Sequence, residues 1–192
     1  MVKHNFVVMV LSVAILSSYA QPAMENETPR VLYSNVVVAD SLSKTQLFQN
    51  AMKYVASLKG LEEKFELKLK DSIDGKLYGQ CSYPVYAQTG ILKKISGAIS
   101  YQLSIEVKDN KYRYHFSDFV FHYYKQDRYY NMVATGKTKS LEDPSASGWQ
   151  KLWNTHRSYT RNKMEGNMKL LEQKMAEDPR KVEKVVAKKV EW

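Results

Sequence analysis

The chain has 192 residues, of which 44% are apolar, 12% aromatic and 26% charged, with five prolines and one cysteine. These values exclude a collagen, a low-complexity disordered tract and a disulfide-stapled scaffold, because a lone thiol cannot close a bridge. The length fits one domain that buries roughly 70% of the surface of its unfolded chain. The formal net charge of +9 favours contact with anionic surfaces or partners.

Residues 1–20 have the pattern of a secretory signal peptide. Lys3 precedes an apolar run over residues 6–16, and Ser18 and Ala20 occupy the two small positions of a cleavage site. The apolar run is shorter than the about 20 residues of a membrane-spanning helix, which argues against an N-terminal anchor. We therefore predict export with cleavage after Ala20, leaving a mature chain without a transmembrane helix.

The next part of the chain predicts a disordered leader, a strand and a helix. Residues 21–30 are polar and include two prolines, whereas residues 31–38 are rich in β-branched side chains. Ser43 and Gln46 have the spacing of a capping box, which opens a helix that ends at Gly60. The apolar stripe of this helix comprises Leu47, Ala51, Tyr54, Val55 and Leu58.

Alternating apolar and polar residues then predict four antiparallel strands with one buried face. Asp74-Gly75 and Asp109-Asn110 are two-residue hairpin turns. In the last strand the apolar residues change from even-numbered to odd-numbered positions, which predicts a bulge near Ser117 and Asp118. The apolar positions are Phe65, Leu67 and Leu69; Leu77, Cys81, Tyr83 and Val85; Ile99, Tyr101, Leu103, Ile105 and Val107; Tyr112, Tyr114 and Phe116; and Phe119, Phe121 and Tyr123.

A long helix follows a segment, residues 126–146, that is predicted to be a loop. Ser147 is a plausible N-cap, and Asp178-Pro179 ends the helix. Its length of roughly 40 Å implies either a bend at Gly166 or a C-terminal half that projects beyond the sheet. Its apolar face comprises Trp149, Leu152, Trp153, His156, Met164, Met168, Leu171 and Met175.

This order predicts one α+β domain over residues 31–178, followed by a basic tail over residues 179–192. The expected architecture is an antiparallel sheet of about five strands with two helices packed on one face, in the order β-α-β-β-β-β-α. Such a sheet has one apolar face beneath the helices and one polar face toward solvent.

The strand–turn–strand segment Leu103–Tyr114 and the start of the helix at Ser43–Leu47 resemble an uncharacterised family of exported bacterial proteins. That family is a domain of unknown function with a TBP-like fold, named for the TATA-binding protein. The resemblance implies this fold and a location in the periplasm or cell envelope of a Gram-negative bacterium. It implies no catalytic residue, and a shared fold does not carry DNA binding with it. Asn110 stands where a glycine is expected in the turn, and Asn also tolerates positive φ.

No pattern in the sequence predicts a catalytic, cofactor or metal site. Gly136-Lys137-Thr138 has Asn131 where a phosphate-binding loop needs glycine. His115 and His122 are seven residues apart, so they face opposite sides of a regular strand, although a bulge would change this. The histidine spacing does not match a zinc site. The single cysteine falls on the apolar face of its strand and is interpreted as a core residue.

Two surfaces are candidates for binding. The basic tail over residues 179–192 is either a solvated terminal helix or a contact for an anionic membrane surface. Export disfavours nucleic acid as its partner. The polar face of the sheet would contact an unknown protein, peptide or glycan through Lys68, Lys70, Tyr78, Gln80, Gln102, Ser104, Arg113 and His115.

The sequence therefore predicts an exported, non-enzymatic binding or assembly module of the cell envelope that needs no cofactor. The alternatives are a small envelope hydrolase and a protein that attaches to the membrane surface through its basic tail.

Overall fold

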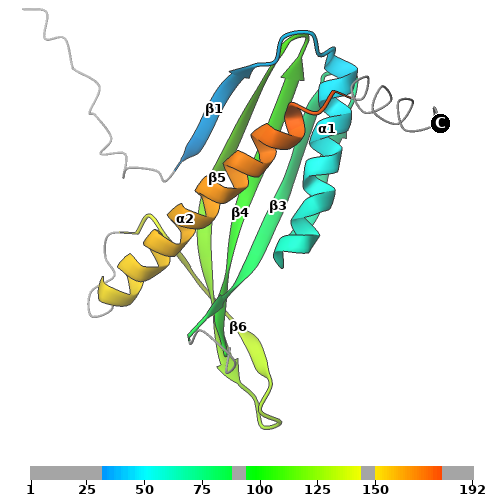
Figure 1. Cartoon of the computed structure of the whole chain (residues 1–192). Helices are drawn as coiled ribbons and strands as arrows, with labels where there is room; N and C mark the ends of the chain where they lie inside the picture. Colours follow the sequence, from blue (N-terminus) through cyan, green and yellow to red (C-terminus); the bar gives the residue numbers. More distant parts are fainter. Residues whose placement is uncertain (1–31, 88–93, 144–149, 179–192) are drawn as a thin grey trace, which may run out of the picture.

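The computed structural model describes residues 32–87, 94–143 and 150–178, in which both helices lie on the same face of one long sheet (Figure 1). The predictions that fall outside the described residues are the signal peptide at 1–20, the leader at 21–30, the N-cap at Ser147, the apolar helix position Trp149 and the tail at 179–192.

The sheet has six antiparallel strands in the order β1-β5-β4-β3-β2, with β6 paired to β5. The predicted turns fall between β2 and β3 and between β4 and β5, where Gly75 and Asn110 have φ angles of 70° and 62°. The strands are β1 Tyr33–Val38, β2 Lys64–Asp71, β3 Lys76–Tyr86, β4 Ile95–Lys108, β5 Lys111–Gln126 and β6 Met132–Ser140.

The sequence-based prediction of a loop over residues 126–146 is wrong, because β6 lies within it, and the sheet has six strands rather than about five. The 16-residue β5 extends past β1, so the backbone groups of its second half need another partner. β6 supplies hydrogen bonds to that half, from Val120 to Gln126. A register shift opposite Tyr123 accommodates Gly136, whose φ is 77°.

The predicted bulge in β5 is confirmed. Asp118 has a φ of 54°, and the partners in β4 change from Gln102 opposite Ser117 to Ser100 opposite Val120. Because of the inserted residue, the aromatic side chains before and after the bulge both point toward the helices. These residues, Phe116 and Phe119, are completely buried.

The first helix, α1 (Lys44–Ser57), begins at the predicted capping box and continues into a 3₁₀ turn, η1 (Leu58–Leu61). The Ser43 hydroxyl accepts a 3.3 Å hydrogen bond from the Gln46 backbone N–H, and the Ser43 N–H donates to the Gln46 side chain at 3.0 Å. These bonds satisfy two N–H groups that lack intrahelical partners, which fixes where the helix starts.

The second helix, α2 (Gln150–Met175), crosses the sheet diagonally as one continuous helix (Figure 1). It passes through Gly166 without interruption, and its C-terminal half stays on the sheet, because Leu171 and Met175 are completely buried. Because the helix runs diagonally, its whole length fits on the sheet. Neither the expected bend at Gly166 nor the expected projection of the C-terminal half occurs. Its buried residues recur at helical spacing and are Trp153, His156, Thr160, Met164, Asn167, Leu171 and Met175.

Candidate functional site: the open face of the sheet

The face of the sheet opposite the helices is not covered by any element of the described residues, and we call it the open face. Tyr83 and Tyr114 mark the other face, because their hydroxyls donate to Thr160 and Glu172 of α2 at 2.9 and 2.7 Å. Successive side chains of a strand point to opposite faces. The polar residues of the open face include Lys64, Glu66, Lys76, Tyr78, Gln80, Ser82, Ser100, Gln102, Ser104, Glu106, Arg113, His115, Ser117 and His122.

Cross-strand registers bring most of the predicted binding residues together at the centre of the open face. Ser104 lies directly between Tyr78 on β3 and His115 on β5, and Gln80 lies opposite Gln102. The Tyr78 hydroxyl donates a 2.6 Å hydrogen bond to the Gln102 side-chain oxygen. This bond holds two neighbouring side chains in fixed positions across the strands.

Two ion pairs also lie on the open face. The Arg113 guanidinium contacts the Glu106 carboxylate at 2.7 and 2.9 Å through two of its nitrogens. Lys68 pairs with Glu66 of the same edge strand, β2. All four groups remain partly exposed, so the pairs orient the side chains and contribute little to stability.

The prediction that Lys70 belongs to the open face is wrong. A register shift in β2 leaves Lys68 unpaired, and the strand then continues with reversed parity. Leu69 therefore pairs with Tyr78 on the open face and is 46% exposed. Lys70 instead pairs with Leu77, a residue of the core, so its side chain belongs to the helix side of the edge strand.

The open face also contains a shallow hollow of about 370 Å³ that sequence reasoning missed. Within it, Ser100 Oγ and His122 Nε2 are 2.8 Å apart, and Ser100 is only 5% exposed. The bulge in β5 brings His122 to the same face as His115, which the change of apolar parity could have indicated. The polar residues that line the hollow are Lys64, Glu66, Gln80, Ser82, Ser100 and His122.

A second hollow, of about 450 Å³, lies at the opposite end of the molecule and contains none of the predicted binding residues. It is formed by the connection between β1 and α1, Tyr112 of β5, and the C-terminal end of α2 with Glu172 and Asp178.

The described residues show neither a metal-ligating cluster nor a phosphate-binding loop. No group of three His, Cys, Asp or Glu side chains in them could hold a metal ion. Gly136-Lys137-Thr138 lies inside β6, a strand, instead of preceding a helix. Cys81 is confirmed as a core residue, and burial raises the pKa of its thiol to about 12. The open face therefore offers hydroxyl, amide, imidazole and charged groups for binding.

No helix in the described part of the chain is both long and apolar enough to cross a membrane.

The comparisons with known proteins match this fold to a family without an assigned activity. No curated protein sequence matches the chain. A crystal structure of a DUF4468 family protein from Bacteroides ovatus superposes with a TM-score of 0.56 at 12% identity, covering 78% of this chain and 88% of that one. A TBP-like protein from Parabacteroides distasonis gives a TM-score of 0.46 at 19% identity, with 74% and 93% covered. Residues 33–122 match the model of the DUF4468 family, described as a domain of unknown function with a TBP-like fold.

Proposed function

We propose that the protein is an exported binding or assembly module of the Gram-negative cell envelope that holds its partner on the open face. The observation that carries the proposal is the arrangement of this face. No described helix or strand covers it, and its side chains are held in place by bonds such as that between Tyr78 and Gln102. Groups already fixed in position lose less conformational entropy on binding than mobile ones do.

The chemistry of the open face fits a protein, peptide or glycan partner. Its central rows present hydroxyl, amide and imidazole groups, including those of Ser104, Gln102 and His115. Both signs of charge occur beside them, at Arg113 and Glu106. Polar groups of this kind form hydrogen bonds to backbone amides and to sugar hydroxyls.

Crosslinking in cells tests the proposal directly. The variant Lys68→Glu, Gln102→Glu and Arg113→Glu should remain folded and lose recovery of the crosslinked partner. A matched control, Lys70→Glu, Lys169→Glu and Gln173→Glu, changes the net charge equally on the helix side and should retain recovery. Equal recovery by both variants would show that the open face is not the binding surface.

Export is tested by fractionation and N-terminal sequencing. The protein should be found in the periplasmic or membrane fraction with Gln21 as its first residue, because Ser18 and Ala20 form the cleavage site. Recovery from the cytoplasm with residues 1–20 intact would contradict the localisation without affecting the binding proposal.

One observation favours a second candidate, a small envelope hydrolase. Ser100 and His122, which both line the hollow of the open face, have the distance of a nucleophile and its general base, 2.8 Å. A fluorophosphonate probe should then label the wild-type protein, and the label should disappear in Ser100→Ala. Absence of labelling in the folded wild type would leave the binding module as the function.

A further inference from the structure

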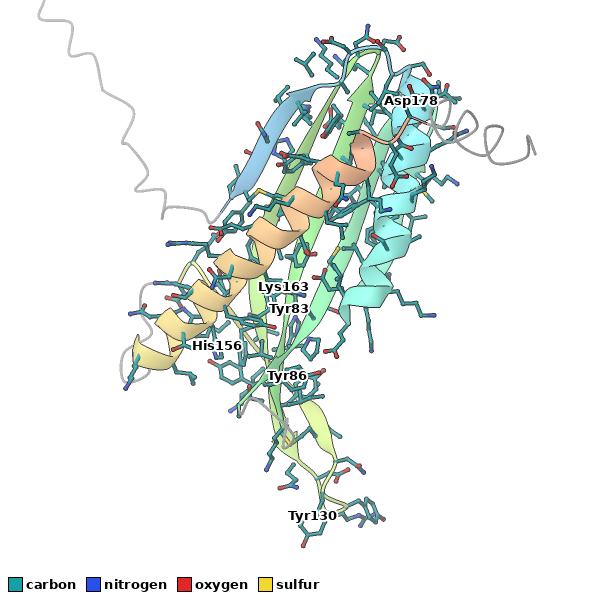
Figure 2. The ribbon with its side chains drawn as sticks, viewed as in Figure 1. Tyr83, Tyr86, Tyr130, His156, Lys163 and Asp178 are labelled. Carbon is teal, nitrogen blue, oxygen red and sulfur yellow. The ribbon has the colours of Figure 1, made fainter. Side chains whose placement is uncertain are left out.

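The end of the hairpin formed by β5 and β6 projects away from the helix-covered part of the sheet (Figure 1). Its last paired residues are Gln126 and Met132, and the turn between them, residues 127–131, is what we call the tip. Figure 2 shows Tyr130 at the far end of the molecule, well separated from His156 and Lys163 on α2.

Hydrogen bonds to one acidic residue fix the shape of the tip. The Asp127 carboxylate accepts from the backbone N–H groups of Tyr129 and Asn131, at 2.8 and 2.9 Å. The Asp127 N–H and carbonyl bond to Asn131 and Tyr130 at 2.9 and 3.1 Å. The turn is therefore ordered, and its side chains are displayed by a defined backbone.

The tip displays two tyrosines that have no cover in the described structure. Tyr129 is 66% exposed and Tyr130 is 82% exposed. The Arg128 guanidinium lies 4.8 Å from the centroid of the Tyr129 ring. Two exposed aromatic rings at consecutive positions of a projecting hairpin offer apolar surface that a partner can bury.

The hairpin that carries these rings has a net positive charge. Residues 123–140 include four basic side chains and one acidic side chain, Asp127, whose carboxylate already accepts two backbone hydrogen bonds. Arg128 stacks on Tyr129, and Lys125 lies next to the last residue pair of the hairpin, whereas Lys139 pairs with Asp143 at the other end of β6. The basic residues are Lys125, Arg128, Lys137 and Lys139.

We infer that the tip binds the surface of an anionic lipid bilayer. Tyrosine rings partition to the interface between lipid and water, and lysine and arginine side chains are attracted to acidic headgroups. The shape also suits this partner, because a narrow projection can reach a planar surface while the rest of the sheet stays away from it. This contact is separate from the open face and from the basic tail at 179–192, so it goes beyond the proposed binding function.

Sedimentation with lipid vesicles tests the inference. The protein used is residues 21–192, because the apolar run at 6–16 would itself enter lipid. This form should sediment with vesicles that contain phosphatidylglycerol and not with pure phosphatidylcholine vesicles, and high salt should weaken the binding. Tyr129→Ala with Tyr130→Ala, and separately Lys125→Gln with Arg128→Gln, should each lower the partition coefficient about tenfold or more.

Matched variants on α2 provide the controls. Tyr159→Ala removes another exposed tyrosine, and Lys151→Gln with Lys169→Gln removes two cations far from the tip. Both should bind vesicles as the wild type does, and circular dichroism should show that all variants are folded. The inference is overturned if the wild type does not bind, if it binds both kinds of vesicle equally, or if the tip variants keep full binding. The last result would assign membrane contact to another part of the chain, such as the tail.

Discussion

The hydroxyl of Tyr101 donates a 2.6 Å hydrogen bond to the carboxylate of Glu63, and both residues are buried in the core. The same carboxylate accepts from the Asn167 side chain at 3.0 Å and pairs with the Lys163 ammonium at 2.8 Å. A buried carboxylate is tolerated when it is paired and hydrogen-bonded in this way. The network joins the residue before β2 to β4 and to the middle of α2, and so fixes the helix on the sheet.

Replacement of Glu63 by alanine should strongly destabilise the protein. The change leaves Tyr101, Asn167 and Lys163 without their shared partner, and breaking a buried pair lowers the free energy of unfolding by about 3–5 kcal/mol. Urea denaturation followed by circular dichroism measures the loss. Glu165→Ala, at an exposed position of α2, should change the free energy of unfolding by no more than about 0.5 kcal/mol. Similar values for the two variants would show that the network does not hold α2 in place.

Stability should fall as the pH drops below about 6.5, in part because of His156. This ring is buried and stacks on Phe121 with centroids 4.6 Å apart, and burial lowers its pKa below the ordinary value. The unfolded chain therefore binds a proton at a pH where the folded chain does not, so acid favours unfolding.

Chemical denaturation at several pH values between 7.5 and 5.5 measures this effect. His156→Gln should flatten the decline in stability, because it removes the group whose pKa burial lowers. An equally steep decline in His156→Gln would show that other groups cause it.

Replacing two glycines by alanine, one at a time, should change the free energy of unfolding in opposite directions. A Cβ atom at Gly79 would lie 2.5 Å from ring atoms of Phe65 and 2.6 Å from the Glu66 carbonyl oxygen, so Gly79→Ala should destabilise by about 1–3 kcal/mol. At Gly166 there is no atom within 4 Å of the added methyl, and alanine stabilises a helix interior by about 0.5–1 kcal/mol relative to glycine. Thermal or urea unfolding of the two variants gives both values, and equal shifts would contradict the prediction.

The thiol of Cys81 should be protected in the folded protein. Burial raises its pKa to about 12, and only the thiolate reacts with disulfide reagents or maleimides. At pH 8 labelling should be at least about 100-fold slower in native protein than in denaturant. The variant Lys169→Cys in a Cys81→Ala background should react at once, because position 169 is exposed. Rapid labelling of native wild-type protein would show that the core near β3 opens readily.

The sequence predicted most of the fold because its signals are local. The capping box at Ser43 and the change of parity near Asp118 each report the conformation of a few neighbouring residues. β6 was missed because it has no such signal. It is a partner for the overhanging half of β5, and its burial does not alternate regularly, so its sequence lacks the pattern of a two-faced strand.

The residues of the open face were predicted less completely, because their positions depend on pairing between strands. The apolar residues of β2 alternate without interruption through Leu69, so nothing local indicates the bulge that moves Lys70 to the other side. The contact between Ser100 and His122 joins residues 22 positions apart and follows only from the register of β4 and β5. Composition and spacing cannot supply that register.

One strand, β5, runs from the Asp109-Asn110 turn at one end of the sheet to the turn that carries Tyr130. Interstrand hydrogen bonds lie across the direction of the strands. A pull on the far end of the hairpin would thus load its ladders with β1 and β4 in shear, and many bonds would have to yield together. The molecule can therefore bear tension between a partner at the tip and a partner on the open face without opening its core.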